Sequence, residues 1–200
     1  MQYLDPIFLI DTLGLIGVLG IVFAESGLFL GFFLPGDSLL FTAGLLASEN
    51  YLNIFVLISL AIIAAVLGDT FGYAFGKKIG PRIFTREHSI FFSIKNLERS
   101  KSFFGKHGKK AIILARFMPA VRTFTPILAG AGQMPYKTFI TYNIVGGAGW
   151  VTLMAGLGYF FGRIIPNPDR YILPVIVIII VISIIPSLVE FIRSNRKTTI

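Results

Sequence analysis

Two interrupted apolar stretches decide the fold: GLIGVLGIVFAESGLFLGFFL at residues 14–34 and AIILARFMPAVRTFTPILAGAGQ at residues 111–133. The first carries Glu25 and runs into Pro35-Gly36-Asp37, and the second carries Arg116, Pro119, Arg122 and Pro126. An acid or arginine at the centre of a membrane helix costs about 2.5–3.5 kcal/mol, and proline removes a backbone donor at the same depth. Keeping such residues in these stretches indicates a polar site rather than simple packing.

The overall composition places the chain in a membrane. Of its 200 residues 54% are hydrophobic and 20 are phenylalanine, and the mean hydropathy is +0.79, which is too apolar for a soluble core of this size. The absence of cysteine excludes disulfides, thiolate metal sites and cysteine nucleophiles. We expect an all-α integral membrane protein with no metal ion, no cofactor and no removable signal peptide.

Positive charge is concentrated in one segment. Residues 77–110 hold ten of the 18 lysines and arginines but only two of the ten acids. The positive-inside rule predicts that this segment is cytoplasmic, together with the basic C-terminal tail at 191–200. Within residues 81–110, apolar residues at helical spacing predict an amphipathic helix whose basic residues at 86–110 attract anionic lipid headgroups. Simple topology determination explains these charges equally well, and neither reading calls for nucleic acid.

Three segments are long and apolar enough to cross a membrane: residues 54–76, 139–162 and 172–189. If Lys110 and Lys137 both lie at the cytoplasmic face, the intervening stretch 111–133 has to enter and leave the membrane on one side. This predicts a re-entrant hairpin there.

The same count of crossings predicts a second hairpin. Residue 54 then lies at the outer face, so residues 14–47 form a hairpin that enters from that face. Non-helical backbone at such a depth is tolerated only where it is buried in protein or lines a water-filled cavity. We expect the hairpins to break at Pro35 and Gly36 in the first and at Pro119 and Pro126 in the second.

An internal repeat with an offset of 86 residues links the two halves. Ala43-Gly44 recurs at Ala129-Gly130, and the glycine-flanked stretch 72–77 recurs at 158–163. One hairpin plus one crossing is an odd number of crossings, so the second copy is expected to be inverted. Inverted repeats with broken helices are a transporter design. The alternative is two unrelated glycine-rich helix ends that serve close packing.

The sequence therefore predicts a single membrane domain over residues 1–200. Its fold is an inverted repeat of a re-entrant hairpin plus a transmembrane helix, with an extra C-terminal transmembrane helix at 172–189. The first copy covers about 13–80 and the second about 111–166.

Several motifs together resemble the bacterial DedA family. They are Phe23-Ala24-Glu25-Ser26-Gly27, the stretch FLPGDS at 33–38, Gly68-Asp69, the stretch RFMPAVR at 116–122, and Asn143 with Gly146 to Trp150. The resemblance covers nearly the whole chain. It implies a multi-pass protein of the bacterial cytoplasmic (inner) membrane with two opposed re-entrant hairpins. It also implies a link to moving polyisoprenyl phosphate or phospholipid across the bilayer, and to the proton gradient.

The family requires an acid pair and an arginine pair, which by motif fall on Glu25 with Asp37 and on Arg116 with Arg122. Arginine suits the binding of a lipid phosphate, because it stays charged and grips two oxygens at once. The simpler alternative is that each arginine only neutralises a carboxylate or bonds hairpin carbonyls.

The acids are candidates for proton coupling, because the protonation of a buried carboxyl group responds to the charges beside it. Glu25 is the best candidate, since it lies in the middle of an apolar run. Asp37 has a competing role as a helix cap after Pro35-Gly36. Asp69 is a third candidate, which we expect to pair with the hairpin arginines.

These residues favour a lipid-phosphate transporter or flippase acting on undecaprenyl phosphate, with coupling to protons as a hypothesis. The alternatives are a nonselective phospholipid scramblase, a proton-coupled small-ion antiporter and an envelope-maintenance assembly factor. An enzyme is disfavoured, because the two histidines, His88 and His107, lie in the basic segment and have no carboxylate pattern around them. Membrane lipids and protons are the expected partners, and the chain leaves room for an oligomer.

Overall fold

Helices make up all the regular structure in the part of the chain that the computed structural model describes, residues 6–28, 36–83 and 110–164. In chain order they are α1 (Pro6–Gly27), α2 (Gly36–Ser48), α3 (Ile54–Ile83), α5 (Lys110–Arg116), α6 (Pro119–Arg122), α7 (Thr125–Ala131) and α8 (Tyr136–Ile164). The predicted all-α fold is confirmed. The predicted crossing at 172–189, the tail at 191–200, Pro35 and most of the basic segment lie outside the described residues.

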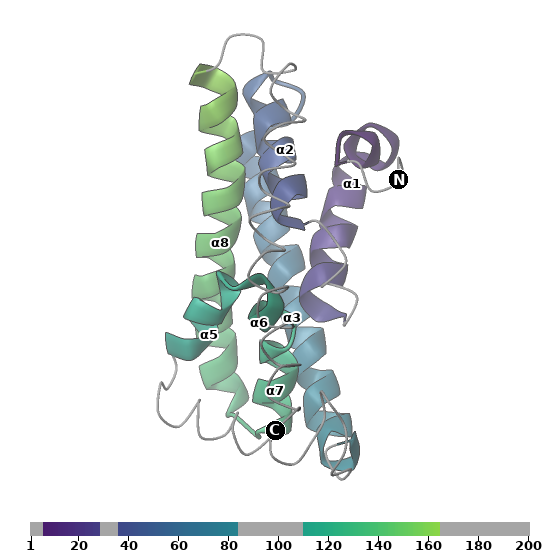
Figure 1. Ribbon diagram of the computed structural model, residues 1–200, viewed down its shortest axis with the longest axis vertical. Coiled ribbons are helices and arrows are strands. Elements are labelled where there is room, and N and C mark those ends of the chain that lie inside the picture. The colour runs from purple at the N-terminus through teal and green to yellow at the C-terminus, as the bar shows by residue number, and fades with distance from the viewer. Residues whose placement is uncertain (1–5, 29–35, 84–109, 165–200) are drawn as a thin grey trace, which may run out of the picture.

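Two long helices, α3 and α8, form the frame of the molecule and run antiparallel to each other (Figure 1). They contain the predicted crossing segments 54–76 and 139–162. Ile54–Ile79 of α3 and the whole of α8 are long and apolar enough to cross a membrane. Both helices expose large apolar side chains, among them Phe55, Leu67, Phe71, Leu153, Leu157 and Phe160. Lipid would cover such a surface favourably.

Local signals mark where these helices begin. Asn53 caps α3, because its side-chain oxygen accepts hydrogen bonds from the backbone N–H groups of Phe55 at 2.9 Å and Val56 at 3.3 Å. The preceding turn contains Asn50 at a positive φ of 67°, a conformation that asparagine tolerates better than most residues. α8 follows directly after Pro135, whose missing N–H is no loss at the start of a helix.

The stretch 111–133 is divided into three short helices. Pro119 begins α6 and Pro126 lies in the first turn of α7, so each proline stands where its missing N–H is tolerated and ends the helix before it. No continuous helix spans this stretch. α1 is also interrupted, at Gly14, where φ is 60° and ψ is −158°.

The short helices pack in a crossed arrangement. α2 lies along α8 and α7 lies along α3, and Figure 1 shows α1 and α2 beside the upper part of the two long helices and α5 to α7 beside the lower part. Gly44 makes the first contact close, because a Cβ there would overlap the backbone of Ala155. Gly130, which is 86 residues later, makes the second contact close against the backbone of Tyr73. α2 and α7 are thus each held by the long helix of the other half, whereas α1 packs on α3 and α5 packs on α8, the long helix of its own half.

The apolar core lies in two parts along the frame. One cluster, among α1, α2, α3 and α8, includes Val22, Leu40, Ala65 and Val151, and the other consists of Tyr73, Ile112, Ala129 and Phe139. Along α3, Asp69 lies one turn from Ala65 and one turn from Tyr73. The space between the two clusters is where the polar residues gather.

Candidate functional site

The five charged residues that the sequence singled out meet between the two apolar clusters. They come from five helices: Glu25 near the end of α1, Asp37 at the start of α2, Asp69 in the middle of α3, Arg116 at the end of α5 and Arg122 at the end of α6. None is more than 9% exposed. Groups of this kind are almost never buried unless they are paired.

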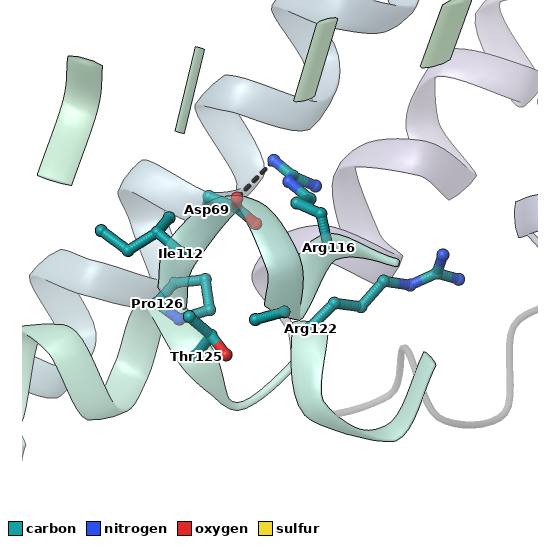
Figure 2. Close-up of a pocket in the computed structure, with 7 residues that line it drawn as sticks. Asp69, Ile112, Arg116, Arg122, Thr125 and Pro126 are labelled. Carbon is teal, nitrogen blue, oxygen red and sulfur yellow. Dashed lines mark ion pairs between the residues drawn. The ribbon is translucent and has the colours of Figure 1, made fainter. Parts of the chain in front are cut away.

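Arg116 is held by the two long helices. It forms an ion pair with Asp69 of α3, and its Nη2 donates to the side-chain oxygen of Asn143 on α8 at 2.8 Å. Longer contacts join it to Ser26 Oγ at 3.4 Å and to the carbonyl oxygen of Ala65 at 3.5 Å. Figure 2 shows its guanidinium group facing Asp69.

Arg122 is held by the acids of the first pair of short helices. Its Nη1 donates to Asp37 Oδ1 at 2.6 Å, and its Nη2 forms an ion pair and hydrogen bond with Glu25 Oε1. This guanidinium therefore joins α6 to both α1 and α2. In Figure 2 the side chain extends away from the contact between Arg116 and Asp69.

Trp150 lies in the centre of the cluster. Its indole Nε1 donates to Asp37 Oδ1 at 2.7 Å, the same oxygen that accepts from Arg122. The guanidinium carbons of Arg122 and Arg116 lie 4.7 Å and 5.7 Å from the ring centroid, within the range of a cation–π contact. One aromatic ring thus contacts both arginines and one of the acids.

Three buried polar atoms of this region have no hydrogen-bond partner in the described part of the chain: Glu25 Oε2, Arg116 Nε and Thr123 Oγ1. Glu25 is also tightly placed, because a Cβ at Gly36 would overlap its carboxylate. The cluster therefore keeps spare acceptor and donor capacity in a region that is otherwise closely packed.

A small pocket opens next to the arginines, on the side of the second group of short helices (Figure 2). It is lined by Asp69, Ile112, Ala115, Arg116, Arg122, Thr125 and Pro126. Its charged lining residues carry both signs, because carboxylates hold the guanidinium groups of Arg116 and Arg122. Among the described residues no group of histidines and acids is arranged to bind a metal ion.

The structure thus brings together all five predicted charged residues and places the predicted breaks at Gly36, Pro119 and Pro126 at or near the starts of short helices. Asp69 pairs with an arginine, and Asp37 lies in the first turn of α2 with its carboxylate on Arg122. Three neighbours of the cluster received no role from the sequence: Ser26, Asn143 and Trp150. Two signals were available, since Asn143 is an amide within an apolar helix and Trp150 is the single tryptophan of the chain.

The chain is similar to several known proteins, two of which are named as membrane proteins. Residues 34–160 match the VTT domain. The chain is 47% identical to protein DedA of Escherichia coli K12 over 178 residues, which cover 88% of this chain and 81% of that protein. It is 42% identical to a membrane protein of Mycobacterium leprae, over 93% of this chain and 86% of that one. The identity to the E. coli inner membrane protein YghB is 31%, over 72% and 65%. No solved structure matches the chain.

Proposed function

The chain belongs to the DedA family of VTT-domain membrane proteins, and from that premise we propose that it moves a lipid phosphate, undecaprenyl phosphate above others, across the cytoplasmic membrane. The observation that carries the proposal is the meeting of Arg116 and Arg122 with three buried acids halfway along two helices of membrane-spanning length. Ionisable groups at membrane depth mark substrate or ion pathways.

In this proposal α1–α2 and α5–α7 are re-entrant hairpins that enter from opposite faces, as parts of an inverted repeat. Their placement beside opposite parts of the frame supports it (Figure 1), as does the close packing at Gly44 and at Gly130, 86 residues later. In the proposed orientation that end of the frame faces the cytoplasm. The exposed lysines near the end of α3 and at the starts of α5 and α8, Lys77, Lys110 and Lys137, support this orientation by the positive-inside rule.

The headgroup binds by exchange for a carboxylate. Both arginines are ion-paired, so a phosphate has to replace an acid at a guanidinium group. Arg122 is the better place for this exchange, because its two partners belong to α1 and α2, and releasing them separates the hairpin tips. A carboxylate released into an apolar site is costly unless it takes a proton. Glu25, with one unpartnered oxygen, is the group to which we assign this proton.

The hydrocarbon tail remains in lipid during this exchange. Beside Arg116, at the break between α5 and α6, the side chains of Leu114, Phe117 and Met118 are 63%, 45% and 53% exposed. A charged pocket next to an exposed apolar surface suits a molecule that has a phosphate at one end and hydrocarbon at the other.

The test is transport by purified protein in liposomes that carry labelled undecaprenyl phosphate in one leaflet. Wild-type protein is compared with Glu25→Gln and Arg122→Lys, with and without a pH gradient. We expect wild-type transport that the gradient accelerates. Each variant should transport at least about tenfold more slowly, because Lys cannot grip two oxygens and Gln cannot take a proton. No transport above empty liposomes by folded wild-type protein would overturn the proposal.

The same liposomes separate the proposal from its nearest alternative. A labelled zwitterionic phospholipid replaces the undecaprenyl phosphate in a second set. A nonselective scramblase would move both lipids at similar rates, whereas the exchange at Arg122 predicts a clear preference for the phosphate monoester. If neither the pH gradient nor Glu25→Gln changes the transport rate, transport is not coupled to protons.

A further inference from the structure

We infer that Trp150 is a positioning residue, which holds the guanidinium of Arg122 and the carboxylate of Asp37 in place while a lipid phosphate exchanges at Arg122. The inference rests on the proposed function and extends it to a residue that has no part in that function so far. Trp150 is 1% exposed and lies near the middle of α8, Tyr136–Ile164.

One face of α8 is shaped to receive the arginines. Asn143, Gly147 and Trp150 follow one another at intervals of four and three residues, so they lie on the same side of the helix. Asn143 binds Arg116 through its oxygen at 2.8 Å. A Cβ at Gly147 would lie 3.4 Å from Arg116 Nη2, an ordinary contact distance, so the guanidinium lies directly against this face of the helix. The indole of Trp150 comes next along this face.

The ring matters most when a carboxylate leaves. In the described structure Asp37 and Glu25 hold Arg122 by charge, and the indole contacts it by its face at 4.7 Å. A phosphate that binds Arg122 displaces both carboxylates, of which Glu25 takes the proton, but it does not displace the ring. The cation–π contact strengthens in a desolvated site, so it keeps the guanidinium in position for the incoming headgroup.

The N–H of the same ring holds the carboxylate of Asp37. Asp37 Oδ1 accepts from both Arg122 and Trp150 Nε1, at 2.6 Å and 2.7 Å. When the phosphate takes Arg122, the indole N–H still binds Asp37. The acid therefore stays within reach and can return to the arginine when the phosphate leaves.

The first test uses the indole as its own reporter, because Trp150 is the single tryptophan of the chain. Purified full-length protein in detergent is titrated with a short-chain polyprenyl monophosphate, and the corresponding polyprenyl alcohol is the control. The inference predicts that the phosphate changes the tryptophan emission and that the alcohol does not. The change should be absent in Arg122→Gln.

The second test separates the face of the ring from its N–H in the liposome assay. Trp150→Phe keeps an aromatic face, whereas Trp150→Leu keeps neither. We expect Trp150→Leu to raise the half-saturating concentration of the phosphate about tenfold, and Trp150→Phe to raise it less. Phe139→Leu is the matched control, since Phe139 is equally buried on α8 but stacks on Tyr73 away from the arginines. It should lower stability and leave the half-saturating concentration unchanged.

The outcomes distinguish the inference from the proposed function. Folded Trp150→Leu protein that transports with the half-saturating concentration of the wild type overturns the inference and leaves the proposed function intact. If Trp150→Leu does not fold, the wild-type titration decides, and an unchanged emission on binding of a transported phosphate overturns the inference. Wild-type protein that neither binds nor moves the phosphate overturns both.

Discussion

Arg116 and Arg122 lie six residues apart on one broken segment, but they are held in different ways. Arg116 pairs with Asp69 on α3 and donates to Asn143 on α8 at 2.8 Å, so its short contacts belong to the two long helices of the frame. Arg122 contacts Glu25 and Asp37, at the facing ends of α1 and α2. The two arginines look equivalent in the sequence motif, but they bind different parts of the molecule. The difference indicates that Arg116 anchors the broken segment to the frame, and it is the reason why we propose the exchange at Arg122.

The largest expected effect is on the anchor. Arg116→Gln leaves Asp69 as an unpaired buried acid, and breaking a buried ion pair in this way costs about 3–5 kcal/mol. The free energy of unfolding in detergent, measured by equilibrium denaturation, should fall by that amount. Adding Asp69→Asn removes the unpaired charge and should restore at least half of the loss. If the Arg116→Gln variant is as stable as the wild type, Arg116 is not the anchor of the broken segment.

A smaller effect is expected at the exchange side. Gly36→Ala puts a Cβ into the space of the Glu25 carboxylate and should destabilise by about 1–3 kcal/mol, the usual range for overpacking. It should also slow transport, because Glu25 cannot keep its contact with Arg122. Gly20→Ala is the control, since a Cβ there meets nothing within 4 Å. Equal stability and transport in the two variants would show that the Glu25 contact is not tightly placed.

The smallest effect belongs to the one contact that joins Arg116 to α1. Ser26 Oγ lies 3.4 Å from Arg116 Nη1, which is too long for a strong hydrogen bond. Ser26→Ala should therefore lower the free energy of unfolding by no more than about 1 kcal/mol and leave the transport rate unchanged. A loss above about 1.5 kcal/mol, in the range of hydrogen bonds to charged groups, would mean that Arg116 is tied to α1 as well.

The sequence predicted the class of the fold and the members of the charged cluster for a physical reason. Charges in apolar segments are so unfavourable that they have to find one another, so Glu25, Asp37 and Asp69 were expected near the arginines. It did not predict which acid pairs with which arginine, because that depends on where the helix breaks fall along the frame. The position of Trp150 beside the arginines could not be predicted either, since an aromatic residue in an apolar helix can face lipid or pack in the core equally well.

The crossed packing of the short helices has a consequence for how the chain assembles. α2 lies along α8, although α8 begins at residue 136, long after α2 ends at residue 48. The surface of α2 around Gly44 can therefore pack on its main partner only after most of the chain has been synthesised. Closing so long a loop is slow. Neither half completes its core alone. Two halves expressed as separate chains, divided between α3 and α5, are expected to be degraded singly and to assemble when they are made together.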